Sequence, residues 1–346
     1  MKHLRPLLRL LLSPLILLST LWGALALIYR LEWPAPAVYA LVIFWCALDG
    51  SLLVLLWRKP PLWALSAHLL AFAALLAWWL TLQPSNQRAW ADDVARMSHG
   101  RVIGEQLLLD NVRNFHWRSD QDYDIRWESR HYNLRQLASV DLLTSYWGMP
   151  AIAHILVSFG FEDGHQLVFT VETRKEKGEL YSEVGGFFKE FELSIVATDE
   201  RDAVRVRTNV RDEDVYLFRI DIPQAAMRRL LLSYVEQASA LVARPRFYNT
   251  LTANCTTIVF DMVQGIIGGL PVDHRLLLTG YLPEYVQGIG GLQKGLSLDE
   301  LRHLGRITER AKRADNAANF STRIRQGVPG WPGGDESHEQ RVGTEK

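Results

Sequence analysis

Three long apolar runs open the chain, and almost all of the charged residues follow them. The runs extend from Leu7 to Tyr29, from Ala35 to Trp57 and from Pro61 to Leu82. Each is long enough to cross a hydrocarbon core of about 30 Å as a helix. A cleavable signal peptide would explain the first run, since basic residues precede it, but not the other two. We therefore predict three transmembrane helices within residues 1–83.

Basic residues mark the same side of the predicted spans. Lys2, Arg5 and Arg9 precede the first span, and the pair at residues 58–59 separates the second from the third. Because cytoplasmic ends of membrane helices carry an excess of Lys and Arg, both clusters are predicted to lie in the cytoplasm. Three spans then place everything after Leu82 outside. We expect a multi-pass protein of the cytoplasmic (inner) membrane with a large C-terminal domain in the periplasm.

The remainder of the chain divides by composition into a connector, a domain and a tail. Residues 84–100 are polar, and residues 101–310 carry strand-like and helix-like runs that predict the extracytoplasmic domain. Residues 311–346, rich in Gly, Pro and charge towards the end, predict a mostly disordered tail. The formal net charge is zero and no basic stripe is present, so we expect no nucleic-acid partner.

Four segments of the outer domain give clear secondary-structure patterns. Residues 203–210 (AVRVRTNV) and 215–222 (VYLFRIDI) alternate as strands do. Residues 223–241 predict an amphipathic helix that begins at Pro223, a favourable early position. Residues 297–314 predict a second helix. Together with the hairpin described next, these segments indicate an α+β fold.

Two β-rich runs, residues 151–161 and 165–173, are joined by Glu162, Asp163 and Gly164. A three-residue loop that ends in Gly is typical of a hairpin in which a type I turn is followed by a left-handed residue. This turn predicts which residues of the two strands lie opposite each other.

The predicted register brings two candidate catalytic residues together. If Phe161 pairs with His165, then His154 lies directly across from Glu172 on the more polar face of the hairpin. Directly opposed side chains have Cβ atoms about 5 Å apart, so these two side chains can interact. A two-residue turn would instead move Glu172 to the other face.

The two cysteines of the chain cannot pair, because Cys46 lies inside a predicted span and Cys255 in the outer domain. A lone thiol in an oxidising compartment suggests a functional role. Cys255 lies in FYNTLTANCTT, just before IVFDMVQ, an apolar run typical of a buried helix. Asn254 or Thr252 can cap that helix. The positive end of the helix dipole then favours the thiolate of Cys255.

A nucleophilic thiol needs a base, and His154 is the best-placed imidazole because it has a carboxylate opposite. Glu172 would orient the ring and stabilise its charged form. His116, His131, His165 and His274 also lie in the outer domain. A metal site of His and Cys would need a tight spacing such as CxxC or HExxH, and the sequence contains neither. We therefore expect no metal and no cofactor.

Structural explanations remain open for each of these residues. Cys255 can be a small buried hydrophobic residue, and His154 can be a histidine satisfied within the core. Glu172 can pair with Arg174 or another base. Asn254 is more readily explained as a helix cap than as a catalytic group.

Three stretches together closely resemble the Lnb-type periplasmic domain family. They are SVDLLTSYWGMPAIAHILVSFGF, ETRKEKGE and RPRFYNTLTANCTT, and the resemblance covers about residues 100–285. It implies an α+β, permuted papain-like (NlpC/LRAT-like) domain, here preceded by three transmembrane helices, with Cys255 as nucleophile and His154 as base. Glu172 matches the ETRKE block, but its role follows from the hairpin register. The family includes a lipoprotein N-acyltransferase whose spans follow the domain, whereas here they precede it.

The resemblance implies two-step acyl transfer through a thioester, with a membrane phospholipid as donor and a lipoprotein amino terminus as acceptor. One alternative is a cysteine amidase or peptidase that acts on cell-wall peptides with water as acceptor. Another is a non-enzymatic, membrane-bound interaction module with a structural Cys. Candidate substrate-binding residues are Asn254, Tyr248, Ser158 and Arg174.

Overall fold

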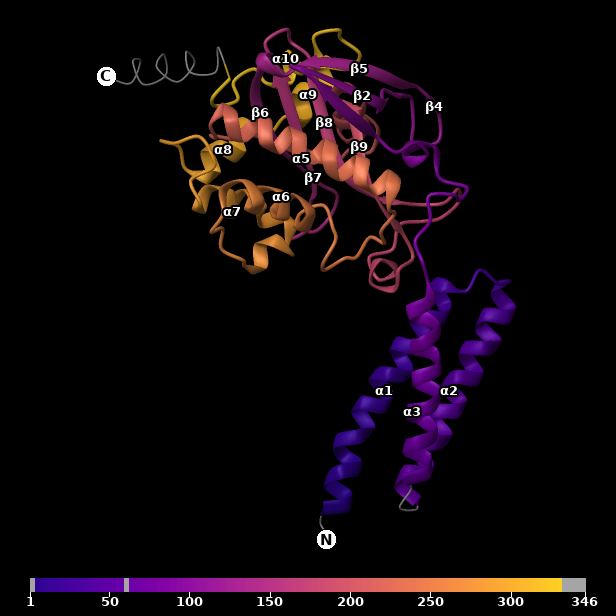
Figure 1. The fold of residues 1–346 in the computed structure, drawn as a ribbon. Coiled ribbons are helices and arrows are strands. Elements are labelled where there is room, and N and C mark those ends of the chain that lie inside the picture. The colour runs from indigo at the N-terminus through magenta and orange to yellow at the C-terminus, as the bar shows by residue number, and fades with distance from the viewer. Residues whose placement is uncertain (1–3, 59–61, 332–346) are drawn as a thin grey trace. The chain divides into compact units, whose positions relative to one another are not determined.

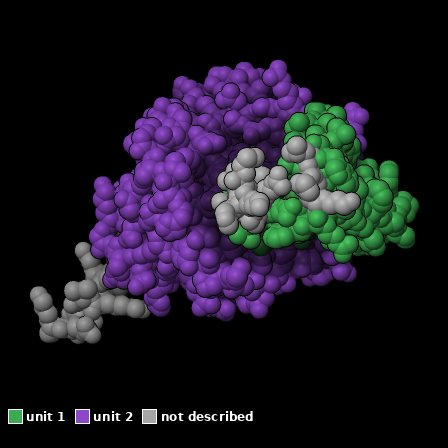
Figure 2. Space-filling model, turned by 90° about the horizontal axis from the view of Figure 1, so that it is seen from below, with its two compact units in different colours: residues 1–85, 181–191 green, residues 86–180, 192–346 purple. Residues whose placement is uncertain are grey.

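The computed structural model describes residues 4–58 and 62–331, and its chain folds into two compact units (Figures 1 and 2). The first unit contains residues 1–85 together with residues 181–191. The second contains residues 86–180 and 192–346. Residues 181–191 therefore belong to the first unit although the residues on both sides of them in sequence belong to the second. This division was not predicted from the sequence.

The first unit is built on three long helices that confirm the predicted runs. They are α1 (Leu4–Arg30), α2 (Ala35–Arg58) and α3 (Leu62–Thr81). All three are long and apolar enough to cross a membrane. The predicted start of the third run at Pro61, and the basic residues Lys2 and Lys59, lie outside the described residues.

A buried polar cluster links the three helices. Asp49 of α2 is 1% exposed, and its carboxylate lies 2.9 Å from Nδ1 of His68 in α3. It also accepts a hydrogen bond of 2.8 Å from Thr20 of α1. Ser19, the neighbour of Thr20, lies 3.0 Å from Nε2 of His68. Polar groups inside an apolar bundle are costly without partners, so these contacts specify how the three helices pair.

The second unit is organised around a mixed sheet. Among the described residues, eight strands form this sheet in the order β1-β2-β9-β8-β7-β6-β10, and β5 pairs with β2. The strands are β1 (His99–Ile103), β2 (Gln106–Arg113), β5 (Trp127–Asn133), β6 (Leu137–Tyr146), β7 (His154–Phe161), β8 (Gln166–Arg174), β9 (Glu192–Asp199) and β10 (Asp214–Arg219). A separate small ribbon joins β3 (His116–Trp117) to β4 (Tyr123–Asp124). The molecule is thus of mixed α+β class.

The β7–β8 hairpin has the predicted register. The amide of Phe161 donates to the carbonyl of His165 at 3.0 Å, and Gly164 has a φ of 85°. Ser158 pairs with Val168, as the predicted count requires. The face predicted to be more polar is nevertheless buried as well, because helices cover both sides of the sheet.

Helices pack on both faces of the sheet (Figure 1). On one face, Tyr234 of α5 (Gln224–Ala243) stacks on Phe169 with ring centroids 4.9 Å apart. On the other, Leu156 and Val168 share a core with residues of α4 (Glu200–Arg205), α9 (Thr308–Ala314) and α10 (Phe320–Ile324). The remaining helices are α6 (Thr257–Ile267), α7 (Leu282–Gly288) and α8 (Leu298–Gly305), together with 3₁₀ segments at 92–94, 134–136, 185–188, 274–276 and 279–281.

The predicted strand at residues 203–210 is wrong. Asp199 accepts a hydrogen bond of 3.0 Å from the amide of Arg201 and so caps α4. A π-helical turn, Val206–Val210, continues it. Ala203 and Val204 are buried on the sheet. The alternation of Val and Arg is typical of a strand, but the cap at Asp199 and the burial of the adjacent Ala203 and Val204 favour a helix.

The predicted helix at residues 297–314 is divided into α8 and α9. Ser297 and Glu300 form a capping box at its start. Gly305 ends α8 where its backbone passes close to β10, because a Cβ at this position would lie 2.5 Å from the carbonyl oxygen of Leu217. The close approach of this glycine to the strand explains the break.

The domain extends past the predicted boundary at residue 310. Phe320 and Ile324 of α10 are 1% and 0% exposed, and Arg325 is fully buried. Residues 311–331 are thus packed against the sheet rather than forming the start of a disordered tail. The remaining part of the predicted tail, residues 332–346, lies outside the described residues.

Candidate active site

Cys255 lies at the start of α6, in the segment that follows α5. The side-chain oxygen of Asn254 accepts hydrogen bonds of 2.9 Å from the amides of both Thr256 and Thr257. Its carbonyl accepts from the amide of Ile258 at 3.2 Å, which is the first helical hydrogen bond. Asn254 therefore caps the turn that leads into α6, and Cys255 lies in this turn, two residues before Thr257, where free amides and the helix dipole favour a negative charge.

The loop before this cap is held by its own side chains. Asn249 pairs with Ala253 as an isolated bridge, and its side-chain oxygen accepts from the amides of Leu251 and Thr252, both at 3.0 Å. The hydroxyl of Thr252 also donates to Asn249 at 3.0 Å, so Thr252 supports the loop and does not cap the helix. The position of Cys255 is thereby defined on both sides.

His154 is the first residue of β7, and a neighbouring segment anchors the chain just before it. Thr279 accepts from the amide of Ala153 at 2.8 Å and donates to its carbonyl at 2.6 Å. The amide of Gly280 donates to Ala151 at 3.0 Å. A Cβ on Gly280 would lie 2.0 Å from the carbonyl oxygen of Pro150, so only glycine allows this approach.

The imidazole of His154 is held by two groups from β8. Its Nε2 lies 2.6 Å from the hydroxyl of Thr170 and 3.2 Å from a carboxylate oxygen of Glu172. The same hydroxyl donates to Glu172 at 2.9 Å, so it accepts the proton of Nε2. Thr170 was missed in the sequence analysis, although it precedes Glu172 by two residues and faces the same side of the strand.

Arg207 is a second partner of Glu172 that the sequence analysis missed. Its guanidinium donates to Glu172 at 3.1 Å and to the carbonyl of Ala203 at 2.8 Å. Burial raises the pKa of Glu172, but His154, Arg207 and Arg113 together hold that pKa well below its usual value. Glu172 therefore carries a negative charge under physiological conditions. It pairs with His154 and Arg207 rather than with Arg174.

The charge state of His154 follows from these neighbours. Burial and the nearby Arg207 lower the pKa of His154. Attraction to Glu172 and hydrogen bonding with Cys255 and Glu172 outweigh them and raise this pKa to about 9. The ring is thus an imidazolium at neutral pH, and Cys255 lies near enough to contribute to its raised pKa. Because Nε2 faces Thr170 and Glu172, Nδ1 is the nitrogen that remains for the thiol.

The same segment of the chain matches a known family. The model of the Lnb N-terminal periplasmic domain covers residues 123–280. Residues 123–280 therefore match the Lnb periplasmic domain family. The match contains His154, Thr170, Glu172, Arg207 and Cys255. No curated protein and no solved structure matches the chain. A periplasmic domain family together with three apolar helices indicates a membrane protein with a periplasmic domain.

Two of the predicted substrate-binding residues, Ser158 and Arg174, are buried and hydrogen-bonded to other parts of the protein. Ser158 is fully buried and donates to Glu200 at 2.7 Å. Arg174, 3% exposed, donates to the carbonyl of Val94 at 3.0 Å and lies over the ring of Trp90 at 4.4 Å. These contacts give both side chains structural roles, and their assignment to substrate binding stays a prediction.

The other two candidates lie next to the thiol in sequence. Asn254 is 4% exposed, and its side-chain amide donates to the carbonyl of Thr250 at 2.7 Å while its oxygen caps α6. The structural explanation, a helix cap, therefore describes Asn254 fully. Tyr248 is 8% exposed and remains a predicted substrate-binding residue.

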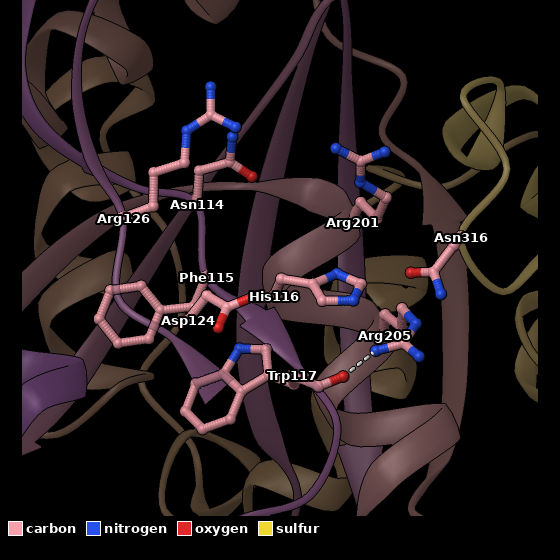
Figure 3. Close-up of a pocket in the computed structure, with 9 residues that line it drawn as sticks. All are labelled: Asn114, Phe115, His116, Trp117, Asp124, Arg126, Arg201, Arg205 and Asn316. Carbon is pink, nitrogen blue, oxygen red and sulfur yellow. Dashed lines mark hydrogen bonds between the residues drawn. The ribbon is translucent and has the colours of Figure 1, made fainter. Parts of the chain in front are cut away.

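A pocket of about 380 Å³ is separate from the thiol centre (Figure 3). Its lining residues are Asn114, Phe115, His116, Trp117, Asp124, Arg126, Arg201, Arg205 and Asn316. Arg205 pairs with Asp315 at 2.8 Å and Arg126 with Glu128 at 2.5 Å, so carboxylates already neutralise these cations. Neither Cys255 nor His154 is among these lining residues.

Replacing Glu172 with Gln is expected to slow alkylation of Cys255 by iodoacetamide at pH 7 by about three- to tenfold, because one pKa unit is a tenfold change in proton affinity. Without this carboxylate the pKa of His154 falls, and the ring holds the thiol's proton less well. The exposed turn residue Glu162 provides the matched control, Glu162→Gln, which should label as the wild type does. Equal alkylation rates in the two variants would show that Glu172 does not contribute to the reactivity of Cys255.

Proposed function

We propose that this protein is a membrane-tethered periplasmic cysteine acyltransferase that forms a thioester on Cys255. The observation that supports this most is the position of His154, whose Nε2 is held by Thr170 and Glu172 and whose pKa, lowered by burial, is raised to about 9 by Glu172 and the nearby Cys255. An oriented imidazolium beside a thiol at a helix start is the arrangement that nucleophilic thiol catalysis requires.

The first half-reaction would transfer an acyl group to the enzyme. The thiolate of Cys255 attacks the ester carbonyl carbon of the donor, and the carbonyl electrons move to its oxygen. The backbone amide of Cys255, in the turn that leads into α6, is the donor we assign to this oxyanion. The carbon–oxygen ester bond then breaks, and His154 gives its Nδ1 proton to the departing alkoxide. A thioester and a neutral imidazole remain.

The second half-reaction would return the enzyme to its starting state. An acceptor amine attacks the thioester carbonyl carbon, and the neutral His154 takes the proton that the amine loses. The carbon–sulfur bond breaks, which releases the amide product and the thiolate of Cys255. Glu172 stays charged throughout and stabilises the imidazolium each time it forms.

Exposed apolar residues around the thiol centre favour a lipid as donor. Trp147 and Met149, in the loop before His154, are 49% and 64% exposed. Leu277 is 46% exposed in the segment that anchors this loop through Thr279 and Gly280. Leu251, in the loop before Cys255, is 48% exposed. Exposed apolar side chains beside a reactive group suit acyl chains better than the polar peptides of the cell wall.

We also propose that the domain has a permuted papain-like fold, because of the order of its elements. The histidine on β7 precedes the cysteine at the start of α6. The acceptor that we propose, by analogy with the family, is the amino terminus of a lipoprotein. Both substrates would then lie at the membrane to which α1, α2 and α3 tether the enzyme.

Intact-mass spectrometry of the purified full-length protein mixed with phospholipid vesicles tests the proposal. We expect a mass increase equal to one acyl chain on the wild type and none on Cys255→Ser. Addition of a lipopeptide with a free amino terminus should remove the adduct and yield an N-acylated lipopeptide. Free fatty acid as the sole product would indicate a hydrolase. Absence of any adduct with all phospholipids, despite reactive Cys255, would overturn lipid acyl transfer.

The proposal also requires three spans with the domain outside the inner membrane. Alkaline phosphatase fused after residue 346 should be active in intact cells, because it folds only in the periplasm, whereas a cytoplasmic reporter at this site should be inactive. Fusions of both reporters after Arg58, at the end of α2, should give the opposite result. A phosphatase that is inactive at the C-terminus beside an active cytoplasmic reporter would refute the proposed orientation.

A further inference from the structure

The segment of residues 181–191, between β8 and β9, has two apolar faces. Its centre is a 3₁₀ helix, Gly185–Phe188, which begins after a turn at Val184. One face packs within the helical unit, and the other is exposed. A segment with this division is unusual between two strands, where a loop is expected to be polar on its outer side.

The inner face packs on α1 and α3. Phe188, 6% exposed, stacks on Tyr29 with ring centroids 5.8 Å apart and meets Trp79 edge-on at 6.1 Å and Trp22 at 6.3 Å. Lys189 donates to the carbonyl of Trp79 at 3.0 Å. These contacts hold the segment against two of the three candidate spans.

The contacts also fix the level of the segment along the helices. Tyr29 is the penultimate residue of α1, and Trp79 is the third from the end of α3. At 1.5 Å per residue both lie within about 3 Å of the helix ends. Trp and Tyr at the ends of membrane helices favour the boundary between headgroups and hydrocarbon. Phe188 also reaches Trp22, eight residues before the end of α1, which lies further into the apolar part of the helix.

The outer face presents apolar side chains at this level. Tyr181, Val184 and Phe187 are 46%, 44% and 40% exposed. Phe187 lies in the 3₁₀ helix and Val184 is its N-cap residue, so these two side chains, three residues apart, lie on the same side. Tyr181 precedes this turn, and its ring also stacks on Phe191 with centroids 6.2 Å apart. Apolar residues of α1 and α3, such as Leu21 (57% exposed) and Leu80 (66% exposed), are also uncovered.

We propose that residues 181–188 insert into the headgroup–hydrocarbon boundary of the periplasmic leaflet, with Tyr181, Val184 and Phe187 in contact with phospholipid. The insertion rests on the proposed spanning topology of the three helices. It does not depend on acyl transfer at Cys255. The lipid contact supplies an apolar environment for the exposed sides of these residues, as for other shallow membrane-binding segments.

The test uses the full-length protein in phospholipid nanodiscs, in a background that carries Cys46→Ala and Cys255→Ala. Single cysteines introduced by Phe187→Cys and, separately, Val184→Cys are labelled with the environment-sensitive dye NBD. Quenching is then measured with lipids that carry a doxyl group at carbon 5, and with aqueous iodide. The matched control is Glu183→Cys, an exposed polar position of the same segment. Ile43→Cys, 68% exposed on α2, reports whether the helices lie in the bilayer.

We expect doxyl quenching at residues 184 and 187 to be at least twofold stronger than at residue 183, with the reverse order for iodide. Quenching at residues 184 and 187 equal to that at residue 183, while residue 43 is strongly quenched, would overturn the insertion. Protection from iodide without doxyl quenching would show that protein, such as a second copy of the chain, covers these residues, and would also overturn the insertion. Absence of doxyl quenching at residue 43 would refute the spanning topology on which the proposal rests.

Discussion

Replacing His154 with Ala is expected to slow formation of the acyl-enzyme by about 10³-fold, the usual contribution of a positioned proton donor. The variant lacks the imidazolium that stabilises the thiolate and that protonates the departing alkoxide. Replacing Cys255 with Ser should lower the rate at least as far, because the hydroxyl has no base that can deprotonate it efficiently at neutral pH. Single-turnover measurements of the acyl adduct by mass spectrometry follow this step directly.

His165→Ala is the matched control for this prediction. His165 lies at the turn of the same hairpin, 65% exposed, where Nδ1 of its ring lies 3.0 Å from a carboxylate oxygen of Asp163. Its loss should leave the rate of acylation unchanged. Unaltered acylation in His154→Ala would remove the imidazole from the mechanism, and equal losses in both histidine variants would point to a general disturbance of the hairpin.

The contact between His154 and Glu172 could be predicted from sequence because it depends on local geometry. A three-residue turn that ends in Gly164 sets the register, and the strand period then places the two residues opposite each other. The cap at Asn254 is similarly local, since it depends on an Asn just before an apolar helix. Both features require only residues that are near in the chain.

Arg207 could not be predicted because its position depends on packing that is distant in sequence. Its segment alternates Val and Arg, and that pattern alone favours a strand. The helix forms because Asp199 caps it and because Ala203 and Val204 bury against the sheet. Only in this helical form does the guanidinium reach Glu172. The candidate Cys–His pair and Glu172 could therefore be predicted from sequence, whereas Arg207, which helps to keep Glu172 charged, could not.

The segment 311–331 was missed for a related reason. Its composition is charged and rich in small residues, which favours disorder when each charge is assumed to be solvated. In the fold, Arg325 is instead the buried partner of two carboxylates. It donates to Asp141 at 2.9 Å and to Glu200 at 2.6 Å. All three residues are at most 1% exposed.

The largest expected loss of stability follows from this cluster. Arg325→Gln should lower the free energy of unfolding by about 3–5 kcal/mol, because it leaves buried Glu200 without its cation and buried Asp141 with Arg219 alone. Urea denaturation of the full-length protein in detergent, followed by near-ultraviolet circular dichroism, measures the change. Arg323→Gln, an exposed arginine on the same helix, is the control and should change stability by less than about 0.5 kcal/mol.

The pH dependence of the free energy of unfolding distinguishes the loss of the Arg325 charge from a simple loss of packing. Burial raises the pKa of Glu200, but attraction and hydrogen bonding to Arg325 dominate and lower it below 4.5. A lowered folded-state pKa adds stability above pH 4.5, and this stability is lost as the pH falls through the folded value. In Arg325→Gln, the attraction and hydrogen bonding that lower the pKa of Glu200 are lost. Burial then raises this pKa, so protonation of Glu200 stabilises the folded variant as the pH falls. The stability difference between wild type and variant should therefore narrow between pH 7 and pH 4.5. A difference that stays constant over this range would show that Arg325 contributes packing rather than charge.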